Sequence, residues 1–345
     1  MNNRAFILVA FFIAAPVYGQ PQGKTKLDSV LLDANNKIET NTSASFKNIE
    51  SFIVVNKGVA KFEKYYGGIN KDSLHHIQSQ TKSIMSLLLG IAIDQGYIKS
   101  EEEPVADYFP EYFSTEDQLK SSVKIKDLLT MSAGFVWEEM LPQDDPKNDN
   151  ANMFRSRKWL HYALLRPMAK TPFTTFKYNS GNPMIVAGII EKASRMKLDE
   201  FAEKNLFIPL GITRYRWLKD STGFCHAGGG LYLKPVDVVK IGILIQNKGI
   251  WESKQIISET WLNKAFQSYF TTEFSGNGYG YFWWVKEMKV NGDKTTKVIS
   301  AQGAGGQYMY VIPEYDLVVS FTERNYSTPI IGPWILANVI LPALE

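Results

Sequence analysis

Apolar side chains recur at helical spacing in residues 84–92, which predicts a buried helix. The apolar positions are Ile84, Leu87, Leu88, Ile91 and Ala92. Gly96 provides a C-terminal stop, because glycine accepts the left-handed backbone that ends many helices. Ser79 then stands at the N-terminus of the helix, and Lys82 shares its face three residues later.

Other runs of apolar residues predict further elements along the chain. Short turns separate two of the strand pairs, at residues 56–58 and at residues 313–316. The expected elements are a helix at residues 26–39, a hairpin at 52–55 and 60–66, a short helix within 123–135 that ends at Gly134, helices at 185–193 and 235–241, a bulky strand at 279–285, and strands at 308–312 and 317–322.

The composition suits a globular protein of one large domain or two closely packed ones. The chain has 345 residues, of which 45% are hydrophobic, and a net charge of +3. This charge is too small and too dispersed to suggest a nucleic-acid partner. A single cysteine, Cys225, is expected to be buried and excludes an internal disulfide or a cysteine-based zinc site. Four histidines without a metal-binding motif give no reason to expect a metal or another cofactor.

The first residues predict a cleaved signal peptide at residues 1–19. A positive start at Arg4 precedes an apolar run over residues 5–15, which is too short to span a membrane. Val17 and Gly19 fit the −3 and −1 positions of a cleavage site, and no cysteine lies nearby to carry a lipid. We therefore expect a periplasmic or secreted protein, residues 20–345, without a stable membrane anchor.

The spacing of Ser79 and Lys82 has a chemical use. A serine hydroxyl is a poor nucleophile at neutral pH and needs a base close by. A lysine serves as that base when burial or a neighbouring cation lowers its pKa. Alone, the S-x-x-K pattern is weak evidence, because the serine can be a simple N-cap and the lysine a solvated side chain. The strongly apolar run after Lys82 indicates a buried helix and favours the chemical interpretation.

The same stretch carries a family resemblance. Residues 79–86, followed by residues 90–96, resemble the S-x-x-K helix of the serine β-lactamase-like hydrolases. That family includes class C β-lactamases, penicillin-binding DD-peptidases, related carboxylesterases and 6-aminohexanoate-dimer hydrolases. The resemblance implies two further motifs downstream of Lys82.

The second motif stands at residues 178–180, Tyr-Asn-Ser. On the resemblance, Tyr178 matches the tyrosine of Y-x-N, which takes the serine proton and returns it to the leaving group. Without the resemblance, Tyr178 could equally be one packed aromatic among 17 tyrosines. The family's third position is often an asparagine that binds the lysine and the amide of an acylamino side chain. Ser180 can accept a hydrogen bond from Lys82, but it is a poorer partner for a β-lactam or a peptide.

The third motif stands at residues 301–303, Ala-Gln-Gly, where the family carries K-T-G or H-T-G. Bulk at Gly303 would collide with the substrate or with the Ser79 helix. The resemblance implies an edge strand that pairs with substrate beside Gln302, with the Ala304 N–H as the second oxyanion donor. The missing cation weakens the binding of a substrate carboxylate, which argues against a dedicated DD-peptidase or β-lactamase.

Two neighbouring glutamates follow the segment that resembles the family's "LLTMxSG". Glu138 and Glu139 are both expected to be solvated, since adjacent residues on a helix face different ways. The polar loop at residues 143–150 comes next and is rich in Asp, Asn, Pro and Lys, which favours mobility.

The three motifs cover most of residues 50–325 and predict an α+β fold of the β-lactamase/transpeptidase type. The resemblance implies an antiparallel sheet built from both chain ends and flanked by helices. A mostly helical region is inserted at about residues 100–240, and the site lies in the cleft between the two parts.

The resemblance also implies a serine hydrolase that cleaves small-molecule esters or amides through an acyl-enzyme on Ser79, with Lys82 and Tyr178 as proton-transfer groups. A β-lactamase or DD-peptidase, and a non-catalytic ligand-binding domain of the same fold, stay open as alternatives. The choice between Lys82 and Tyr178 as general base, the natural substrate and the oligomeric state also stay open.

Overall fold

The computed structural model describes residues 25–114, 116–272, 276–292 and 294–344. The predicted signal peptide lies outside these residues. None of the helices in the described ranges combines the length and the apolar character that a membrane span requires.

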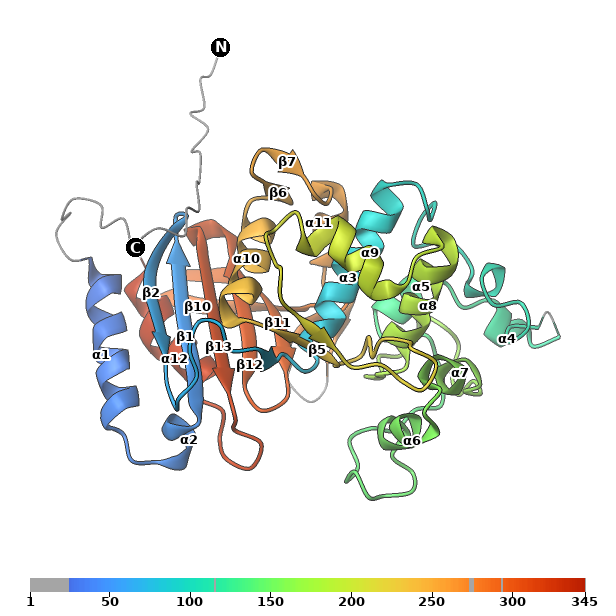
Figure 1. The fold of residues 1–345 in the computed structure, drawn as a ribbon, viewed down its shortest axis with the longest axis horizontal. Helices are drawn as coiled ribbons and strands as arrows, with labels where there is room; N and C mark the ends of the chain where they lie inside the picture. The colour runs from blue at the N-terminus through green and yellow to red at the C-terminus, as the bar shows by residue number, and fades with distance from the viewer. Residues whose placement is uncertain (1–24, 115, 273–275, 293, 345) are drawn as a thin grey trace, which may run out of the picture.

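An antiparallel sheet of eight strands forms one end of the described structure, and a helical region forms the other (Figure 1). The spatial order is β2-β1-β13-β12-β11-β10-β9-β8, so both ends of the chain contribute strands. This confirms the predicted α+β class and the sheet shared by the two chain ends. The strands are β1 (Ile49–Asn56), β2 (Val59–Tyr65), β8 (Phe270–Thr271), β9 (Gly278–Tyr279), β10 (Trp284–Asn291), β11 (Lys294–Gly303), β12 (Gln307–Ile312) and β13 (Leu317–Glu323).

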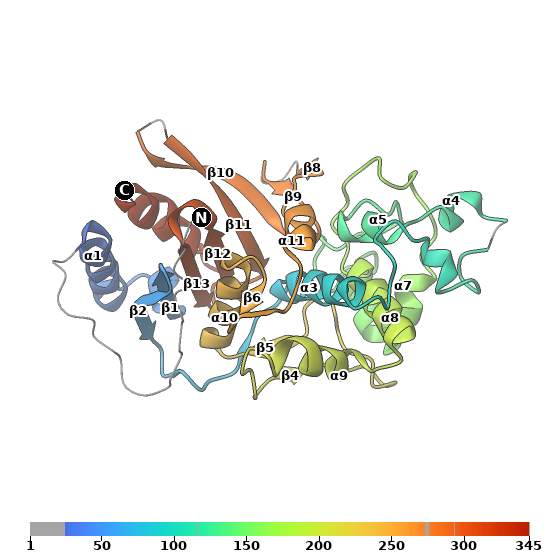
Figure 2. The same ribbon diagram turned by 90° about the horizontal axis from the view of Figure 1, so that it is seen from above.

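Helices cover both faces of this sheet (Figure 2). On one face, α1 and the C-terminal helical turns bury an apolar cluster that includes Leu31, Phe321 and Leu336. On the other face, α10 packs against β12 and β13, and α3 packs against β11 and β12. The covering elements are α1 (Lys26–Thr40), α2 (Ala44–Lys47), α3 (Gln80–Asp94), α10 (Pro235–Gln246), α12 (Gly332–Ile335), and the helical turns η3 (Pro313–Tyr315), η4 (Leu336–Ile340) and η5 (Leu341–Ala343).

The segment between about residues 100 and 240 supplies most of the remaining helices. A small sheet in the order β3-β5-β4 forms here, in which β5 pairs with β3, the strand that leads into α3, and β4 pairs with β5. The elements are β3 (His75–His76), η1 (Val105–Asp107), α4 (Gln118–Ser121), α5 (Ile125–Leu129), α6 (Asp149–Ser156), α7 (Trp159–Leu164), α8 (Asn182–Ser194), α9 (Leu198–Ala202), η2 (Glu203–Phe207), β4 (Arg216–Trp217) and β5 (Leu231–Leu233). Beyond α10 lie β6 (Ile250–Trp251), β7 (Lys254–Gln255) and α11 (Glu259–Ala265).

Helix α3 joins the two parts, because it contacts α8 of the helical region as well as the sheet. The predicted helix is confirmed, with Ser79 at the N-cap position and Gly96 left-handed, at a φ of 74°, just beyond the C-cap. Gly90 makes room for Trp261, since a Cβ at this position would lie 2.3 Å from the indole. Trp261 Nε1 in turn donates to the Ser86 carbonyl at 3.0 Å, which fixes the helix along its length.

Three sequence expectations need correction. The bulky strand at 279–285 is two strands, β9 and β10, because Phe282 adopts a left-handed φ of 62° between them. The Phe282 amide donates to Leu129, and its carbonyl accepts from the Ser83 hydroxyl at 2.7 Å, so distant contacts impose this turn. Helix α5 ends at Leu129, five residues before Gly134.

Strand β11 was expected to be an edge strand, and this is wrong for most of its length. It lies inside the sheet between β10 and β12. However, β10 begins at Trp284, opposite Ser300, so residues 301–303 pair only with β12 within the described structure. The strand is therefore an edge only over its last three residues, which are those of the third motif.

Candidate active site

Ser79 and Lys82 meet as the spacing predicted. Lys82 Nζ donates a hydrogen bond to Ser79 Oγ at 3.0 Å. The Lys82 side chain is only 2% exposed, whereas Ser79 is half-buried. Among the described residues no carboxylate forms an ion pair with Lys82. The amine is thus held against the hydroxyl without an acid to compete for it.

The second partner of Lys82 is a backbone carbonyl. Lys82 Nζ donates to the Gly228 oxygen at 2.5 Å. Residues 226–230 turn sharply into β5 and lie against the segment before α3, because the Gly229 oxygen accepts from His76 Nε2 at 2.5 Å. The glycine-rich turn therefore contacts the chain on both sides of Ser79, at His76 and at Lys82, through backbone carbonyls.

Tyr178 lies beside the same amine. Its ring centroid is 4.9 Å from Lys82 Nζ, and the ring stacks on Trp284 at 6.1 Å. Asn179 fixes the turn that carries Tyr178, because its side-chain oxygen accepts from the Gly181 amide at 2.7 Å and from the Asn182 amide at 3.2 Å, at the start of α8. No hydrogen bond between the Tyr178 hydroxyl and Ser79 or Lys82 is present among the described residues. Such contacts are often long in unliganded enzymes.

Ser180 does not contact Lys82 as the sequence suggested. Its hydroxyl donates to Glu139 Oε1 at 3.0 Å, and its amide donates to Glu139 Oε2 at 2.7 Å. The expectation that both neighbouring glutamates are solvated is therefore wrong for Glu139, which also accepts from Trp137 Nε1 at 2.6 Å. Glu138 instead pairs with Lys177 at the surface. A sequence of two adjacent glutamates gives no signal that distinguishes their roles.

The third motif lies against the residues that precede Ser79. A Cβ at Gly303 would lie 2.5 Å from the Ile77 oxygen and 2.9 Å from the Gln78 Cβ, so the predicted collision is with the entry to the Ser79 helix. Ala304 follows at the exposed end of β11. Gln302 lies one residue before Gly303, and its side chain donates to Ser300 Oγ at 2.9 Å.

Replacing Gly303 with alanine is expected to lower both activity and stability. The new methyl group must displace the Ile77–Gln78 backbone, which costs about 1–3 kcal/mol of stability and about tenfold to a hundredfold in kcat through misplacement of Ser79. Thermal unfolding and ester hydrolysis measure the two effects. Gly229→Ala is the matched control, since its Cβ would lie 3.6 Å from the same Gln78 and needs no shift. Equal behaviour of the two variants would contradict the prediction.

A chain of polar contacts around Gln78 was not expected from the sequence. This residue has a left-handed φ of 53° directly before Ser79. Its side-chain amide donates to His76 Nδ1 at 3.0 Å and to the Tyr326 hydroxyl at 2.9 Å. Because His76 Nδ1 accepts from Gln78 while Nε2 donates to the Gly229 oxygen, the ring carries a single proton and is neutral, and burial lowers the pKa of His76 in agreement. These hydrogen bonds stabilise Gln78 in its left-handed conformation, whose backbone strain costs on the order of 1 kcal/mol.

His226 lies beneath the glycine turn as a buried neutral base. It is 3% exposed, and its ring packs against Phe154 and Trp159 at 4.6 and 5.0 Å. Neither ring nitrogen has a hydrogen-bond partner among the described residues. Burial first, and then the charge of Lys82, lower the pKa of His226 to about 3.

Acid is expected to destabilise the protein through His226. The folded state leaves the ring neutral down to about pH 3, whereas the unfolded chain binds a proton near pH 6.5. Between these values the unfolded state holds more protons, so the free energy of unfolding falls as the pH falls. Going from pH 7 to pH 5 should cost about 2 kcal/mol more in the native chain than in His226→Leu. Urea unfolding of both proteins at the two pH values measures this difference, and parallel pH dependence would refute it.

Two other kinds of site, a metal centre and a reactive cysteine, find no support in the described residues. No group of three or more His, Cys, Asp or Glu side chains there is arranged to hold a metal ion. Cys225 is buried, as expected, and burial raises the pKa of its thiol to about 12.

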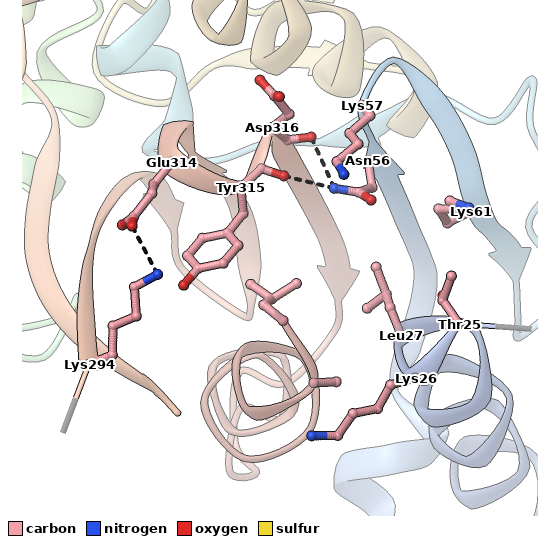
Figure 3. A pocket seen from close by; sticks show the side chains of 12 residues that line it. Thr25, Lys26, Leu27, Asn56, Lys57, Lys61, Lys294, Glu314, Tyr315 and Asp316 are labelled. Carbon is pink, nitrogen blue, oxygen red and sulfur yellow. Dashed lines mark hydrogen bonds and ion pairs between the residues drawn. The ribbon is translucent and has the colours of Figure 1, made fainter. Parts of the chain in front are cut away.

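A pocket of about 340 Å³ lies away from Ser79, between α1, the β1–β2 turn and the C-terminal helical turns (Figure 3). Lys294 lines it at the opposite end of β11 from Gly303, about 30 Å away at strand spacing. Two of its lysines are already engaged, Lys294 with Glu314 at 3.3 Å and Lys26 with the Pro342 carbonyl at 3.0 Å. No serine, cysteine or histidine lines this pocket, so it holds no counterpart of the Ser79–Lys82 pair.

Comparisons with known proteins find a matching family model, related sequences and similar structures. A family model described as Beta-lactamase matches residues 50–329. The 6-aminohexanoate-dimer hydrolase of Paenarthrobacter ureafaciens is 24% identical over 290 residues, which cover 78% of this chain and 71% of that protein.

Solved structures share the fold. The penicillin-binding protein homologue from Pyrococcus abyssi has a TM-score of 0.66 at 21% identity, covering 90% of this chain and 76% of that one. EstCE1, described as a hydrolase with promiscuous acyltransferase activity, has a TM-score of 0.74 at 12% identity, covering 91% and 99%.

Proposed function

Because the chain belongs to the beta-lactamase family, we propose that it is a serine hydrolase that cleaves ester or amide bonds through an acyl-enzyme on Ser79. One observation carries the proposal. The buried Lys82 amine lies 3.0 Å from Ser79 Oγ, at the start of a helix, with the Tyr178 ring 4.9 Å from the same nitrogen. A hydroxyl with an adjacent base, and a third group beside that base, is the arrangement that nucleophilic catalysis requires.

In the proposed first step, Ser79 Oγ attacks the substrate carbonyl carbon. Its proton passes to the Lys82–Tyr178 pair, and the negative oxygen is held by the backbone N–H groups of Ser79 and Ala304. Collapse of this intermediate breaks the bond to the leaving alcohol or amine, which receives the proton. Water then attacks the acyl-enzyme with the same pair as base, which releases the acid and restores Ser79.

Two features argue against a β-lactam or a peptide as the substrate and favour other small esters or amides. Position 301 is alanine, so the third motif lacks the cation that would hold a substrate carboxylate. Ser180 is already engaged with Glu139, so its hydroxyl does not face an acylamino side chain. The matched relative is named for hydrolysis of the 6-aminohexanoate dimer, and the structural neighbour EstCE1 is described as a hydrolase.

The test is the release of nitrophenol from a short-chain nitrophenyl ester, followed from the first turnover for the wild type and Ser79→Ala. A burst that disappears in the variant supports a covalent serine hydrolase. A chromogenic cephalosporin, assayed in parallel, should be turned over more slowly, and faster turnover would point to a β-lactamase. If the folded wild type releases no nitrophenol, a covalent serine probe separates an amide-only enzyme, which it labels, from a non-catalytic binding domain, which it does not.

We also propose that the protein is exported, on the basis of the predicted signal peptide. The mature protein should then begin near Gln20. N-terminal sequencing of the protein from its native host tests this, and a retained Met1 would argue against export.

A further inference from the structure

We propose that Glu139 is a positioning residue for the proton-transfer groups, an inference that rests on the proposed function. Its carboxylate fixes the turn that carries Tyr178 and, through Ser180 and Gly228, the carbonyl that receives Lys82. The role was not visible in the sequence, where Glu139 is one of two adjacent glutamates.

The carboxylate of Glu139 binds the Tyr178 turn at two points. It accepts from the Ser180 amide at 2.7 Å and from the Ser180 hydroxyl at 3.0 Å. Hydrogen bonds to an ionised group are about twice as strong as those between neutral groups. Two such bonds to one residue fix both the backbone and the side chain of the turn, two residues after Tyr178.

Trp137 anchors the carboxylate to the core. Its indole N–H donates to Glu139 Oε2 at 2.6 Å, and the tryptophan is 3% exposed. The same indole packs against the Tyr178 turn, since a Cβ at Gly181 would lie 2.9 Å from its ring. Glu139 therefore links the buried Trp137 side chain to the turn that carries Tyr178.

The Tyr178 turn also packs against Gly228, the residue whose carbonyl binds Lys82. A Cβ at Gly228 would lie 2.9 Å from the Ser180 oxygen and 3.3 Å from the Ser180 Cβ, so the two residues are packed in direct contact. The Gly228 carbonyl is in turn the acceptor of Lys82 Nζ at 2.5 Å. A shift of Ser180 would therefore move the acceptor that orients the amine toward Ser79.

The charge of Glu139 also reaches the aromatic side of the site. Burial raises the pKa of Tyr279 well above its usual range, and the Tyr178 and Glu139 charges raise it further. The Tyr279 ring contacts the Tyr178 ring at 6.4 Å. Glu139 therefore acts electrostatically on the ring that packs against Tyr178.

Glu138 provides a matched control in the neighbouring position. Its carboxylate pairs with Lys177 at 2.8 Å, and both side chains are more than a third exposed, at 37% and 47%. Such surface pairs contribute little to stability. The two glutamates have the same chemistry, but Glu138 bonds only the exposed side chain of Lys177 in this segment, whereas Glu139 bonds the backbone and the hydroxyl of Ser180.

The experiment compares Glu139→Ala, Glu139→Gln and Glu138→Ala in nitrophenyl ester hydrolysis, with each rate divided by the burst amplitude to count active sites. Glu139→Ala should lower kcat per active site about a hundredfold with little change in KM, the cost of a misplacement of about 1 Å. Glu139→Gln should recover at least tenfold, because its amide can keep the contacts to Ser180 and Trp137. Glu138→Ala should match the wild type in both kcat per active site and KM.

A per-site rate for Glu139→Ala within threefold of Glu138→Ala would overturn the inference. A loss without recovery in Glu139→Gln, or a loss that appears mainly in KM, would also overturn it, because a general structural defect gives that result. If Glu139→Ala does not fold, Ser180→Ala is measured instead, since it removes only the hydroxyl contact. This variant should lose about tenfold in kcat per active site. An unchanged kcat would overturn the inference. Ser79→Ala is measured alongside, and activity retained there would refute the proposed function itself.

Discussion

Replacing Lys82 with methionine is expected to abolish activity almost as completely as Ser79→Ala does, with a loss of at least about 10⁴-fold in kcat/KM for each. The reason is that Ser79 and Lys82 act as a unit, since the lysine amine lies 3.0 Å from the hydroxyl it serves. Residues that act as a unit give non-additive losses, so the double variant should be no worse than either single one. Burst kinetics with a nitrophenyl ester measure acylation directly in all three variants.

Lys120 supplies the control for loss of a buried lysine. It is 8% exposed, its amine donates to the Leu164 carbonyl at 2.7 Å, and it lies 5.1 Å from the Phe113 ring. Lys82 has the same three features, a buried stem, a carbonyl acceptor and an aromatic neighbour. Lys120→Met should therefore reproduce any loss of stability while leaving the rate per active site unchanged. Substantial activity in Lys82→Met would remove lysine from the mechanism.

Tyr178→Phe is expected to lower kcat about 10²- to 10⁴-fold, the usual contribution of a group that transfers a proton in the transition state. The substitution keeps the ring that lies 4.9 Å from Lys82 Nζ and stacks on Trp284, so it removes only the hydroxyl. KM should change little, because the shape of the site is preserved. Steady-state kinetics and the pH dependence of kcat provide the measurement.

Tyr326→Phe is the companion variant for this prediction. Its hydroxyl accepts from the Gln78 amide at 2.9 Å, next to Ser79, and has no place in the proposed proton transfer. A loss of less than tenfold is expected from a weakened contact of this kind. If Tyr178→Phe loses no more than Tyr326→Phe, Lys82 alone manages the proton and the tyrosine only packs.

The parts of the site that follow from local rules were predictable from the sequence. Ser79 and Lys82 meet because residues three apart share a helix face, and this holds in any helix. Gly303 lies against the Ser79 helix, as its position in the third motif suggested. The sheet from both chain ends followed from the family resemblance, and strands β12 and β13 from their apolar runs.

The parts that depend on contacts between distant segments were not predictable. Glu139 reaches Ser180 across 41 residues, and Lys82 reaches Gly228 across 146, with no periodic pattern to mark either pair. The left-handed φ of Phe282 was not predictable either, because a phenylalanine gives no turn signal. The conformation is imposed by two hydrogen bonds, from its amide to the Leu129 carbonyl and from the Ser83 hydroxyl to its own carbonyl.

The sheet shared by the two chain ends sets the order of events during synthesis. Strand β1 pairs with β13, and Ser51 in one bonds Thr322 in the other, 271 residues further along the chain. At ribosomal rates this partner arrives roughly 15 to 55 s after β1 emerges. Until then β1 has only the β2 hairpin, which is marginally stable in water, and its apolar residues stay exposed. We therefore expect the nascent chain to bind a holding chaperone. A chain truncated before residue 317 should aggregate rather than fold.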